Sequence, residues 1–283
     1  MSNIVLTGST GFIGSNLLKA LRALDHKVIE LNRSSGNVAE TATWSSLPAS
    51  EIVIHLAALT FVPDSWNDPY QYIQTNLQGT ICALEYCKKH KAKLIFMSSY
   101  LYGKAISLPI CEEAEIKAFN PYSLSKKMAE EACSFYAENF DVKITILRPF
   151  NVYGPGQKTE FLIPSVIKQL MEGESVKVKV LEPKRDYIYI DDVIAFIIKG
   201  MQLDDKLNVF NIGTGISYSV AELIQAIQDV MKTDFPVYAS GEKRMDEVLD
   251  TKADISKAAH LLNWTPEFTL KSGIAKILTL KKM

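Results

Sequence analysis

The sequence predicts an α/β protein with a doubly wound parallel sheet and a smaller C-terminal α/β region. Two observations support this. Short apolar runs alternate with longer stretches of helical periodicity, and this alternation loosens after residue 149, where prolines become frequent. Strands that alternate with helices indicate right-handed β–α–β units, and such units build a parallel sheet.

The first half of the chain supplies the strands and helices of this sheet. Continuous apolar runs, typical of strands buried on both faces, predict strands at residues 3–7, 28–31, 52–56, 94–98 and 144–147. The clearest helices between them are predicted at 12–24, 70–90 and 122–140. Residues 32–51 are too few for a full helix and strand, so we expect the sheet to lack one unit there.

A second region of loops and helices is predicted after Pro149. Helical periodicity returns there at residues 161–172, 219–232 and 254–262. We therefore expect one domain from residues 1–150 together with about 186–212. Residues 151–185 and 213–283 would form the other.

The composition excludes several classes of partner. The chain has 283 residues, of which 47% are hydrophobic and 22% charged, and its net charge is -1. A nucleic-acid-binding protein would show a basic surplus, and a polybasic membrane anchor would show a cluster of like charges. No apolar run approaches the ~18 residues of a membrane span, and the first residues are strand-like rather than typical of a signal peptide. We expect a soluble, cytoplasmic protein that binds neither nucleic acid nor membrane.

The cysteines show no spacing typical of a metal site. Cys82, Cys87, Cys111 and Cys133 form no CxxC pair, and no histidine lies at zinc-ligand spacing. We expect free thiols that pack as small hydrophobic side chains, and no metal.

A glycine-rich turn joins the first predicted strand to the first helix, and its sequence is Thr7-Gly8-Ser9-Thr10-Gly11-Phe12-Ile13-Gly14. Glycines allow a backbone to turn sharply and to approach a pyrophosphate closely, and the helix behind them offers unpaired N–H groups. The turn therefore predicts dinucleotide binding. The expected contacts are Gly8, Thr10, Gly11, Phe12, Ile13 and Gly14.

Five further segments follow in a fixed order. They are Met97-Ser98-Ser99-Tyr100-Leu101-Tyr102-Gly103, Asn120-Pro121-Tyr122-Ser123-Leu124-Ser125-Lys126, residues 148–156, residues 185–188 and residues 211–215. With the GxxGxxG spacing, this series resembles the extended short-chain dehydrogenases/reductases, in particular the NAD-dependent epimerase/dehydratase family of nucleotide-sugar enzymes. The resemblance covers nearly the whole chain. It implies a Rossmann-type dinucleotide-binding domain at 1–150 and about 186–212, and a nucleotide-sugar-binding region in the remainder.

The spacing of Tyr122 and Lys126 predicts a catalytic pair, because residues four apart on a helix lie on one face. A tyrosine has a pKa of ~10 and is a poor acid–base group at neutral pH. A nearby ammonium would stabilise the phenolate and lower that pKa, so we expect Lys126 to lower the pKa of Tyr122.

Tyr100 and Lys104 have the same spacing, but Gly103 between them argues against a helix at that place. The resemblance implies Ser98 as the third catalytic residue, and Ser99 is the alternative.

The cofactor preference depends on the residues about 20 positions beyond the glycines. Relatives that use NAD usually carry aspartate where this chain has Asn32, since a carboxylate binds the ribose hydroxyls and repels a phosphate. Asn32 followed by Arg33 removes that repulsion and adds a cation. This favours NADP(H) over NAD(H), although Arg33 could instead cover the adenine face.

The resemblance implies the remaining site residues. Further cofactor contacts are expected at Leu56, Ala57, Ala58, Asn76, Tyr122, Lys126, Pro149 and Phe150. Expected substrate contacts are Thr60, Ser98, Ser99, Tyr100, Asn151, Leu162, Ile163, Arg185 and Arg244. Arginine suits the substrate's diphosphate because its planar fork bonds phosphate oxygens in pairs. We interpret His55 as structural.

Two reactions remain open within the resemblance. Tyr100 stands where related dehydratases carry an acid, so we do not expect elimination. The chain is then either a 4-ketoreductase or a 4-epimerase, such as one acting on UDP-glucose or UDP-N-acetylglucosamine. The short segment after residue 31 and the Asn32–Arg33 pair favour the reductase, and residues 60–66 resemble GDP-6-deoxy-4-keto-mannose reductases. A non-catalytic binding protein is disfavoured by the intact Ser98, Tyr122 and Lys126. The resemblance also implies a homodimer through the helices at 70–90 and 122–140.

Overall fold

The computed structural model describes residues 1–242 and 248–281, and it divides into two compact units that are described separately. Unit 1 contains Met1–Gly103, Glu112–Pro149 and Ile194–Asn211. Unit 2 contains Lys104–Cys111, Phe150–Val193 and Ile212–Met283.

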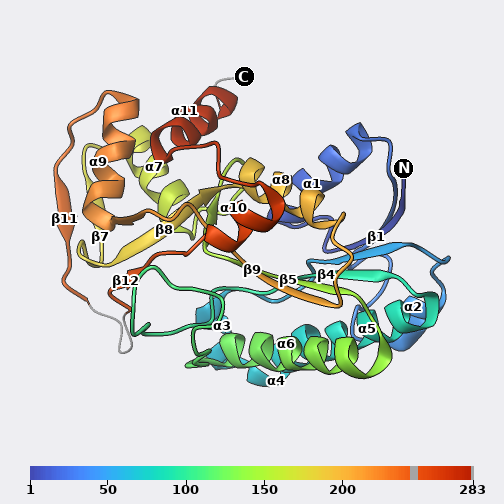
Figure 1. The fold of residues 1–283 in the computed structure, drawn as a ribbon. Coiled ribbons are helices and arrows are strands. Elements are labelled where there is room, and N and C mark those ends of the chain that lie inside the picture. The colour runs from blue at the N-terminus through green and yellow to red at the C-terminus, as the bar shows by residue number, and fades with distance from the viewer. Residues whose placement is uncertain (243–247, 282–283) are drawn as a thin grey trace. The chain divides into compact units, whose positions relative to one another are not determined.

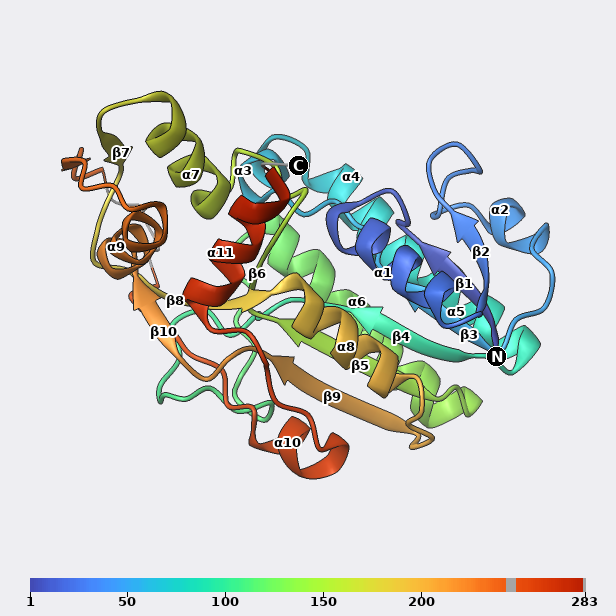
Figure 2. The same ribbon diagram turned by 90° about the horizontal axis from the view of Figure 1, so that it is seen from above.

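The predicted doubly wound parallel sheet is confirmed. Six strands lie in the order β2-β1-β3-β4-β5-β9 (Figure 2). Their bounds are β1 Asn3–Thr7, β2 Lys27–Leu31, β3 Ile52–His55, β4 Lys93–Met97, β5 Ile144–Pro149 and β9 Leu207–Ile212. The neighbours from β2 to β5 pair in parallel. The carboxyl ends of these strands therefore meet at one edge of the sheet, where α/β proteins bind their ligands.

Helices of unit 1 cover this sheet (Figure 1). Their bounds are α1 Phe12–Ala23, α2 Thr41–Ser45, α3 Val62–Asn67, α4 Pro69–Ile73, η1 Gln74–Gln78, α5 Gly79–His90 and α6 Pro121–Phe140. The main core cluster joins apolar strand residues such as Val53, Leu94 and Ile144 to small residues on α5 and α6. None of the helices within the described ranges is long and apolar enough to cross a membrane.

The helix predicted at 70–90 differs from the observed structure. It consists of α4, one π-helical turn (η1) and α5. The π turn carries Asn76, whose side chain bonds to the loop at Leu59 and to α6. The change from α-helix to π-helix thus occurs where Asn76 forms hydrogen bonds to other elements. The hydrophobic periodicity of the sequence carries no signal of such bonds.

The missing sheet unit after residue 31 is confirmed, because residues 32–51 contain only the short helix α2. The buried Trp44 anchors this segment. Its indole N–H donates to the carbonyl oxygen of Val38 at 2.8 Å, and its ring centroid lies 5.6 Å from that of Tyr86 on α5. One tryptophan thus holds the segment against α5 without a further strand.

Unit 2 contains short strands that the sequence did not predict. In its main sheet β8 pairs with β10, β12 and β6. A separate two-stranded sheet contains β11 and β7. Their bounds are β6 Asn151–Tyr153, β7 Val176–Val178, β8 Lys184–Tyr189, β10 Ser217–Ser219, β11 Val237–Ala239 and β12 Asp250–Thr251. The helices of this unit are α7 Leu162–Glu172, α9 Val220–Met231, α10 Ser256–Leu262 and α11 Leu270–Lys281, while α8 Ile190–Gly200 begins in unit 2 and continues into unit 1 at Ile194. The central strand β8 begins with a charged run, Lys184-Arg185-Asp186, so its pattern does not indicate a buried strand.

Asp186 on β8 links three segments of unit 2. Its side chain is fully buried, and one carboxylate oxygen accepts from the Thr214 amide and hydroxyl at 2.8 and 2.7 Å. The other oxygen accepts from the amides of Gly215 and Ala253 at 2.9 and 3.2 Å. A single carboxylate therefore ties the turn at 213–216 and the end of β12 to β8.

Asp186→Asn should destabilise the protein by roughly 2–4 kcal/mol, because the new amide N–H₂ faces N–H donors that then lose their acceptor. Denaturant unfolding curves measure the loss. The matched control is Asp191→Asn, whose carboxylate makes a surface ion pair with Lys276 at 2.7 Å. That change should cost less than about 1 kcal/mol. Equal losses in the two variants would show that Asp186 does not hold unit 2 together.

Candidate active site

The glycine turn has the geometry of a phosphate-binding loop. Gly8 has a φ of +69°, and a Cβ at Gly8 would lie 2.8 Å from the Ala57 amide nitrogen. A Cβ at Gly14 would lie 2.1 Å from the carbonyl oxygen of Gly8. Gly11 is the N-cap residue of α1, so no side chain of the cap bonds to the first amides of the helix. The turn thus accepts only glycine at these two places and leaves the first amides of α1 open to an anion.

The other residues expected at this turn lie beside it. Thr10 is exposed, and Phe12 and Ile13 open α1 as half-buried side chains. Both positions are compatible with a ligand that lies against the helix N-terminus.

Thr7 and His55 support the turn from the ends of β1 and β3. The Thr7 hydroxyl oxygen accepts from the amides of Leu56 and Ala57 at 3.1 and 3.0 Å, and it lies 2.9 Å from His55 Nδ1. Because the hydroxyl accepts from two amides, its own proton is donated to Nδ1. Burial lowers the pKa of His55 to about 3, so its ring is neutral at working pH. These contacts fit the structural role expected for His55.

The end of β2 presents hydrogen-bond donors. Asn32 Oδ1 accepts from the amide and the hydroxyl of Ser34 at 3.0 and 2.6 Å. The backbone donor fixes the orientation of the amide, so Nδ2 lies on the other side, 3.5 Å from Ser9 Oγ. Arg33 is exposed. The side-chain oxygen of Asn32 is therefore engaged within the loop and one of its N–H groups donates to Ser9, so the second N–H and the Arg33 cation remain for a ligand.

Asn76 holds the loop after β3 against α6. Its Oδ1 accepts from the Leu59 amide at 2.8 Å, and Nδ2 donates to the Leu59 carbonyl oxygen at 3.0 Å and to Ser125 Oγ at 2.9 Å. Ser125 Oγ in turn donates to the carbonyl oxygen of Tyr122 at 2.7 Å. Both N–H groups of the amide are thus used to hold this loop, in which Ala58 is half-buried and Thr60 is exposed.

Tyr122 and Lys126 lie on the first turns of α6, as predicted. The helix starts at a capping box in which the Ser123 amide donates to Asn120 Oδ1 at 2.7 Å. The competing pair is not on a helix, because the chain around Tyr100 and Lys104 forms bends and irregular loop.

The segment that follows β4 brings two serines to the same place. The Ser98 amide donates to the Leu147 carbonyl oxygen at 2.7 Å, which extends β4 alongside β5. Ser98 Oγ is buried and has no hydrogen-bond partner among the residues that the structure describes. The Ser99 side chain instead bonds to the Tyr122 phenol. A buried hydroxyl without a partner costs free energy, so Ser98 Oγ marks a position for a ligand's polar atom.

The expected effect of Lys126 on Tyr122 is wrong. Burial raises the pKa of Tyr122 to about 12, with smaller contributions from Tyr100 and Tyr72, and Lys126 is not among the groups that act on it. Lys126 Nζ lies over the Phe96 ring, 4.3 Å from its centroid. Burial lowers the pKa of Lys126 to about 8.

A buried ion pair that sequence reasoning missed fixes the same helix to the sheet. Arg148 at the end of β5 donates to Glu130 on α6 at 2.6 Å, and their side chains are 7% and 6% exposed. Arg148 also donates to the Tyr102 hydroxyl at 2.9 Å. Glu130 lies four residues after Lys126, and this spacing is the one signal that could have indicated it.

The expected substrate residues of unit 2 lie on or near its main sheet. Asn151 Nδ2 donates to the Asp186 carbonyl oxygen at 3.1 Å. Arg185 Nη1 donates to the carbonyl oxygens of Lys184 and Val248 at 2.8 and 2.6 Å. Leu162 and Ile163 open α7, and Phe150 donates its amide to the Ile212 carbonyl oxygen at 2.9 Å. Pro149 is the last residue of β5, and Arg244 lies outside the described residues.

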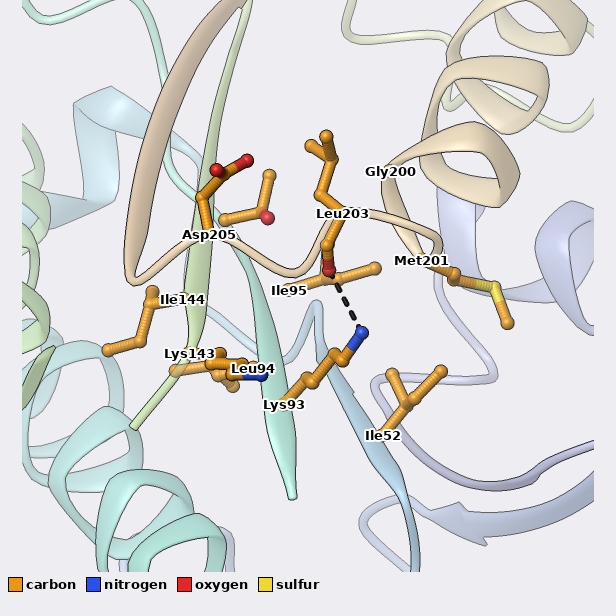
Figure 3. A pocket seen from close by; sticks show the side chains of 11 residues that line it. Ile52, Lys93, Leu94, Ile95, Lys143, Ile144, Gly200, Met201, Leu203 and Asp205 are labelled. Carbon is orange, nitrogen blue, oxygen red and sulfur yellow. Dashed lines mark hydrogen bonds between the residues drawn. The ribbon is translucent and has the colours of Figure 1, made fainter. Parts of the chain in front are cut away.

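A small pocket lies at the opposite, amino-terminal edge of the sheet of unit 1. Figure 3 shows Lys93 reaching the Leu203 carbonyl oxygen there, at 3.0 Å. Asp204 bonds to Lys93 and Lys143 at 2.8 and 2.6 Å. None of the expected site residues lines this pocket, and its two lysines, Lys93 and Lys143, pair with the neighbouring Asp204. Within residues 1–242 and 248–281, no group of His, Cys, Asp or Glu is placed to hold a metal ion.

Comparison with known proteins gives consistent matches. A family model described as NAD dependent epimerase/dehydratase family matches residues 4–213. GDP-6-deoxy-D-mannose reductase of Pseudomonas aeruginosa is 28% identical over 298 residues, which cover 98% of this chain and 96% of that protein. A putative UDP-glucose 4-epimerase of Methanocaldococcus jannaschii is 32% identical over 304 residues, covering 99% of this chain and 98% of that protein.

A solved structure, RMD from Pseudomonas aeruginosa complexed with NADPH, matches with a TM-score of 0.89 and 27% identity, and the match covers 99% of this chain and 98% of that one. The family model alone spans most of the chain, and the glycine turn, the orphaned Ser98 hydroxyl and the Tyr122–Lys126 pair lie within its limits. The chain therefore belongs to the NAD dependent epimerase/dehydratase family.

Proposed function

We propose that this enzyme is an NADPH-dependent 4-ketoreductase acting on a nucleotide-linked 4-keto-6-deoxy sugar. The observation that carries the proposal is the end of β2, where the Asn32 N–H₂ group and the Arg33 cation stand in place of a carboxylate. Donors and a cation bind a 2′-phosphate, whereas a carboxylate binds ribose hydroxyls and repels a phosphate.

Several groups of unit 1 fit the cofactor. The glycine turn and the open amides of α1 suit the pyrophosphate. The residues proposed to hold the rest are Leu56, Ala57, Ala58, Asn76, Tyr122, Lys126, Pro149 and Phe150. NADPH, when bound, supplies the hydride for the carbonyl carbon.

Side chains of unit 1 would then bind the carbonyl oxygen of the sugar and protonate it. Ser98 Oγ, which has no partner among the described residues, donates a hydrogen bond to the C4 oxygen. Tyr122 transfers its proton to that oxygen as the C4 carbonyl becomes an alcohol. Lys126, which is not among the groups that shift the pKa of Tyr122, would bind the ribose of the nicotinamide. Because the pKa of Tyr122 is raised to about 12, the phenol is protonated at neutral pH, which is the form that a reduction requires.

The expected substrate contacts are proposed separately for each unit. We propose that Thr60, Ser99 and Tyr100 in unit 1 contact the sugar, and that Asn151, Leu162 and Ile163 in unit 2 contact the nucleotide. Arg185 and Arg244 would bind the diphosphate. Tyr100 stands where related dehydratases carry an acid, which argues against elimination. On this proposal unit 1 is the dinucleotide-binding part, and unit 2 is the nucleotide-sugar-binding part.

The second candidate function is a nucleotide-sugar 4-epimerase. The 32% identity with a putative UDP-glucose 4-epimerase favours it. An epimerase must first remove the proton from the C4 hydroxyl, which requires the phenolate form of Tyr122. Burial raises the pKa of Tyr122 to about 12 and so favours the phenol, which is the form that the reductase requires.

A homodimer through α5 and α6 also remains a proposal. On α6, Leu124, Phe135 and Phe140 are 42%, 55% and 40% exposed, which leaves apolar surface for a second copy of the chain.

Mixing the enzyme with NADPH and GDP-4-keto-6-deoxymannose should oxidise one NADPH for each sugar reduced, as measured by the loss of absorbance at 340 nm and by chromatography of the sugar nucleotide. UDP-glucose should not be converted to its C4 epimer. Conversion of UDP-glucose without net consumption of cofactor would contradict the reductase and support the epimerase.

Tyr122→Phe should reduce turnover by about 100- to 10,000-fold, the range typical of losing a general acid. Binding of the nucleotide sugar, measured by calorimetry, should persist. The matched control is Tyr72→Phe. The Tyr72 ring lies 6.5 Å from that of Tyr122, but its hydroxyl donates to the Phe61 carbonyl oxygen. The control should keep most of the activity, and a loss as large as that of Tyr122→Phe would reject Tyr122 as the proton donor.

Asn32→Asp should weaken NADPH binding by roughly 10-fold or more and leave NADH binding unchanged or stronger, because a carboxylate repels the 2′-phosphate. Asn37→Asp is the control. It adds the same charge five residues further along, where the side chain bonds to Glu40 and the Ala39 amide. Titrations of both cofactors measure the outcome, and an unchanged ratio of the two affinities in Asn32→Asp would place the 2′-phosphate elsewhere.

A further inference from the structure

The ammonium group of Lys126 has an unusual environment. Lys126 is 2% exposed, and among the described residues its Nζ forms no hydrogen bond and no ion pair. Nζ lies over the face of the Phe96 ring, 4.3 Å from the ring centroid. A buried charge without a partner is unfavourable, and an aromatic face is one of the few apolar surfaces that attract a cation.

Phe96 is itself held in place by a row of side chains across three strands. Thr7, His55 and Phe96 are consecutive partners in the registers of β1, β3 and β4. Thr7 bonds to His55, and the His55 ring stacks on Phe96 with centroids 6.1 Å apart and planes 20° apart. Phe96 is fully buried. The ring therefore has a fixed position relative to the glycine turn, which Thr7 supports from the other end of the row.

We propose that Phe96 is a positioning residue of the active site, whose ring face holds the Lys126 ammonium in place and in its charged form. The inference rests on the proposed role of the Tyr122–Lys126 pair. Removing the electron density from that ring face would weaken the attraction for the cation and favour the neutral amine.

The other groups near Lys126 do not replace this contact. Glu130 and Cys133 on α6 act on the ammonium electrostatically, but the Glu130 carboxylate is bonded to Arg148. Burial raises the pKa of Cys133 well above its usual value, so this thiol is neutral. From β3, His55 is neutral because its pKa is lowered to about 3, and Tyr122 on α6 is protonated. None of these charge states depends on the electron density of the Phe96 ring.

The test replaces Phe96 by phenylalanines carrying one, two and three ring fluorines, which withdraw electron density with little change in size. The pKa of Lys126 is measured in the protein without cofactor by ¹³Cε lysine NMR, and its signal is assigned by its loss in Lys126→Met. The pKa of Lys126, which burial lowers to about 8 in the unmodified protein, should decrease with each added fluorine. The total decrease should be roughly one pH unit. The pH above which NADPH binding weakens should fall in parallel.

The control fluorinates Phe140, whose ring lies 4.1 Å from Lys88 Nζ at the surface of unit 1. This change alters a cation–ring contact of the same kind and should leave the Lys126 midpoint unchanged. A Lys126 midpoint that stays constant across the Phe96 series would overturn the proposal, as would an equal shift in the Phe140 series.

The two proposals fail separately in this design, because the NMR titration requires neither substrate nor turnover. A stepwise fall of the midpoint supports the role of Phe96 even if the enzyme reduces no 4-keto sugar. Reduction of the sugar with a constant midpoint would leave the proposed function intact and reject the role of Phe96.

Discussion

The candidate site depends on the shared register of β1, β3 and β4. Because these parallel strands end together, Thr7, His55 and Phe96 stand in one row at their carboxyl ends. At one end of the row, the Thr7 hydroxyl accepts from the amides of Leu56 and Ala57, and the glycine turn at Gly8 lies next to Ala57. The other end carries the aromatic face below Lys126. A slip of one strand by one residue would turn its side chain to the opposite face of the sheet and would break the row between the glycine turn and Lys126.

Helix α6 is placed on this row by polar contacts as well as by packing. The ion pair of Arg148 and Glu130 is almost fully buried, and breaking such a pair by removing one partner typically costs about 3–5 kcal/mol. Asn76 joins the loop at Leu59 to Ser125, one residue before Lys126. Each of these contacts has a demanding geometry, so together they allow α6 one position on the sheet. Tyr122 and Lys126 are consequently fixed before any ligand binds.

Much of unit 1 could be predicted from the sequence, because buried parallel strands and amphipathic helices leave strong periodic signals. The glycine turn and the Tyr122–Lys126 spacing were also visible, since both depend on residue type at short range. The π turn at Asn76, the bonds of Arg148 and the contact of Lys126 with Phe96 were not visible, because they join residues far apart in sequence. The short strands of unit 2 were missed for another reason: β8 begins with three charged residues, and its burial follows from partners such as the four donors to Asp186.

The central claim is that this site delivers one hydride and one proton to a sugar carbonyl and releases the alcohol. The most direct measurement uses NADPH deuterated at C4 of the nicotinamide, with mass spectrometry of the sugar nucleotide formed from a 4-keto-6-deoxy substrate. The account predicts a product that carries one deuterium at the sugar C4 and an equal amount of released NADP⁺. A 4-epimerase keeps its cofactor and returns the hydride to the same sugar. Interconversion of C4 epimers with no deuterium incorporated and no cofactor consumed would therefore contradict the account.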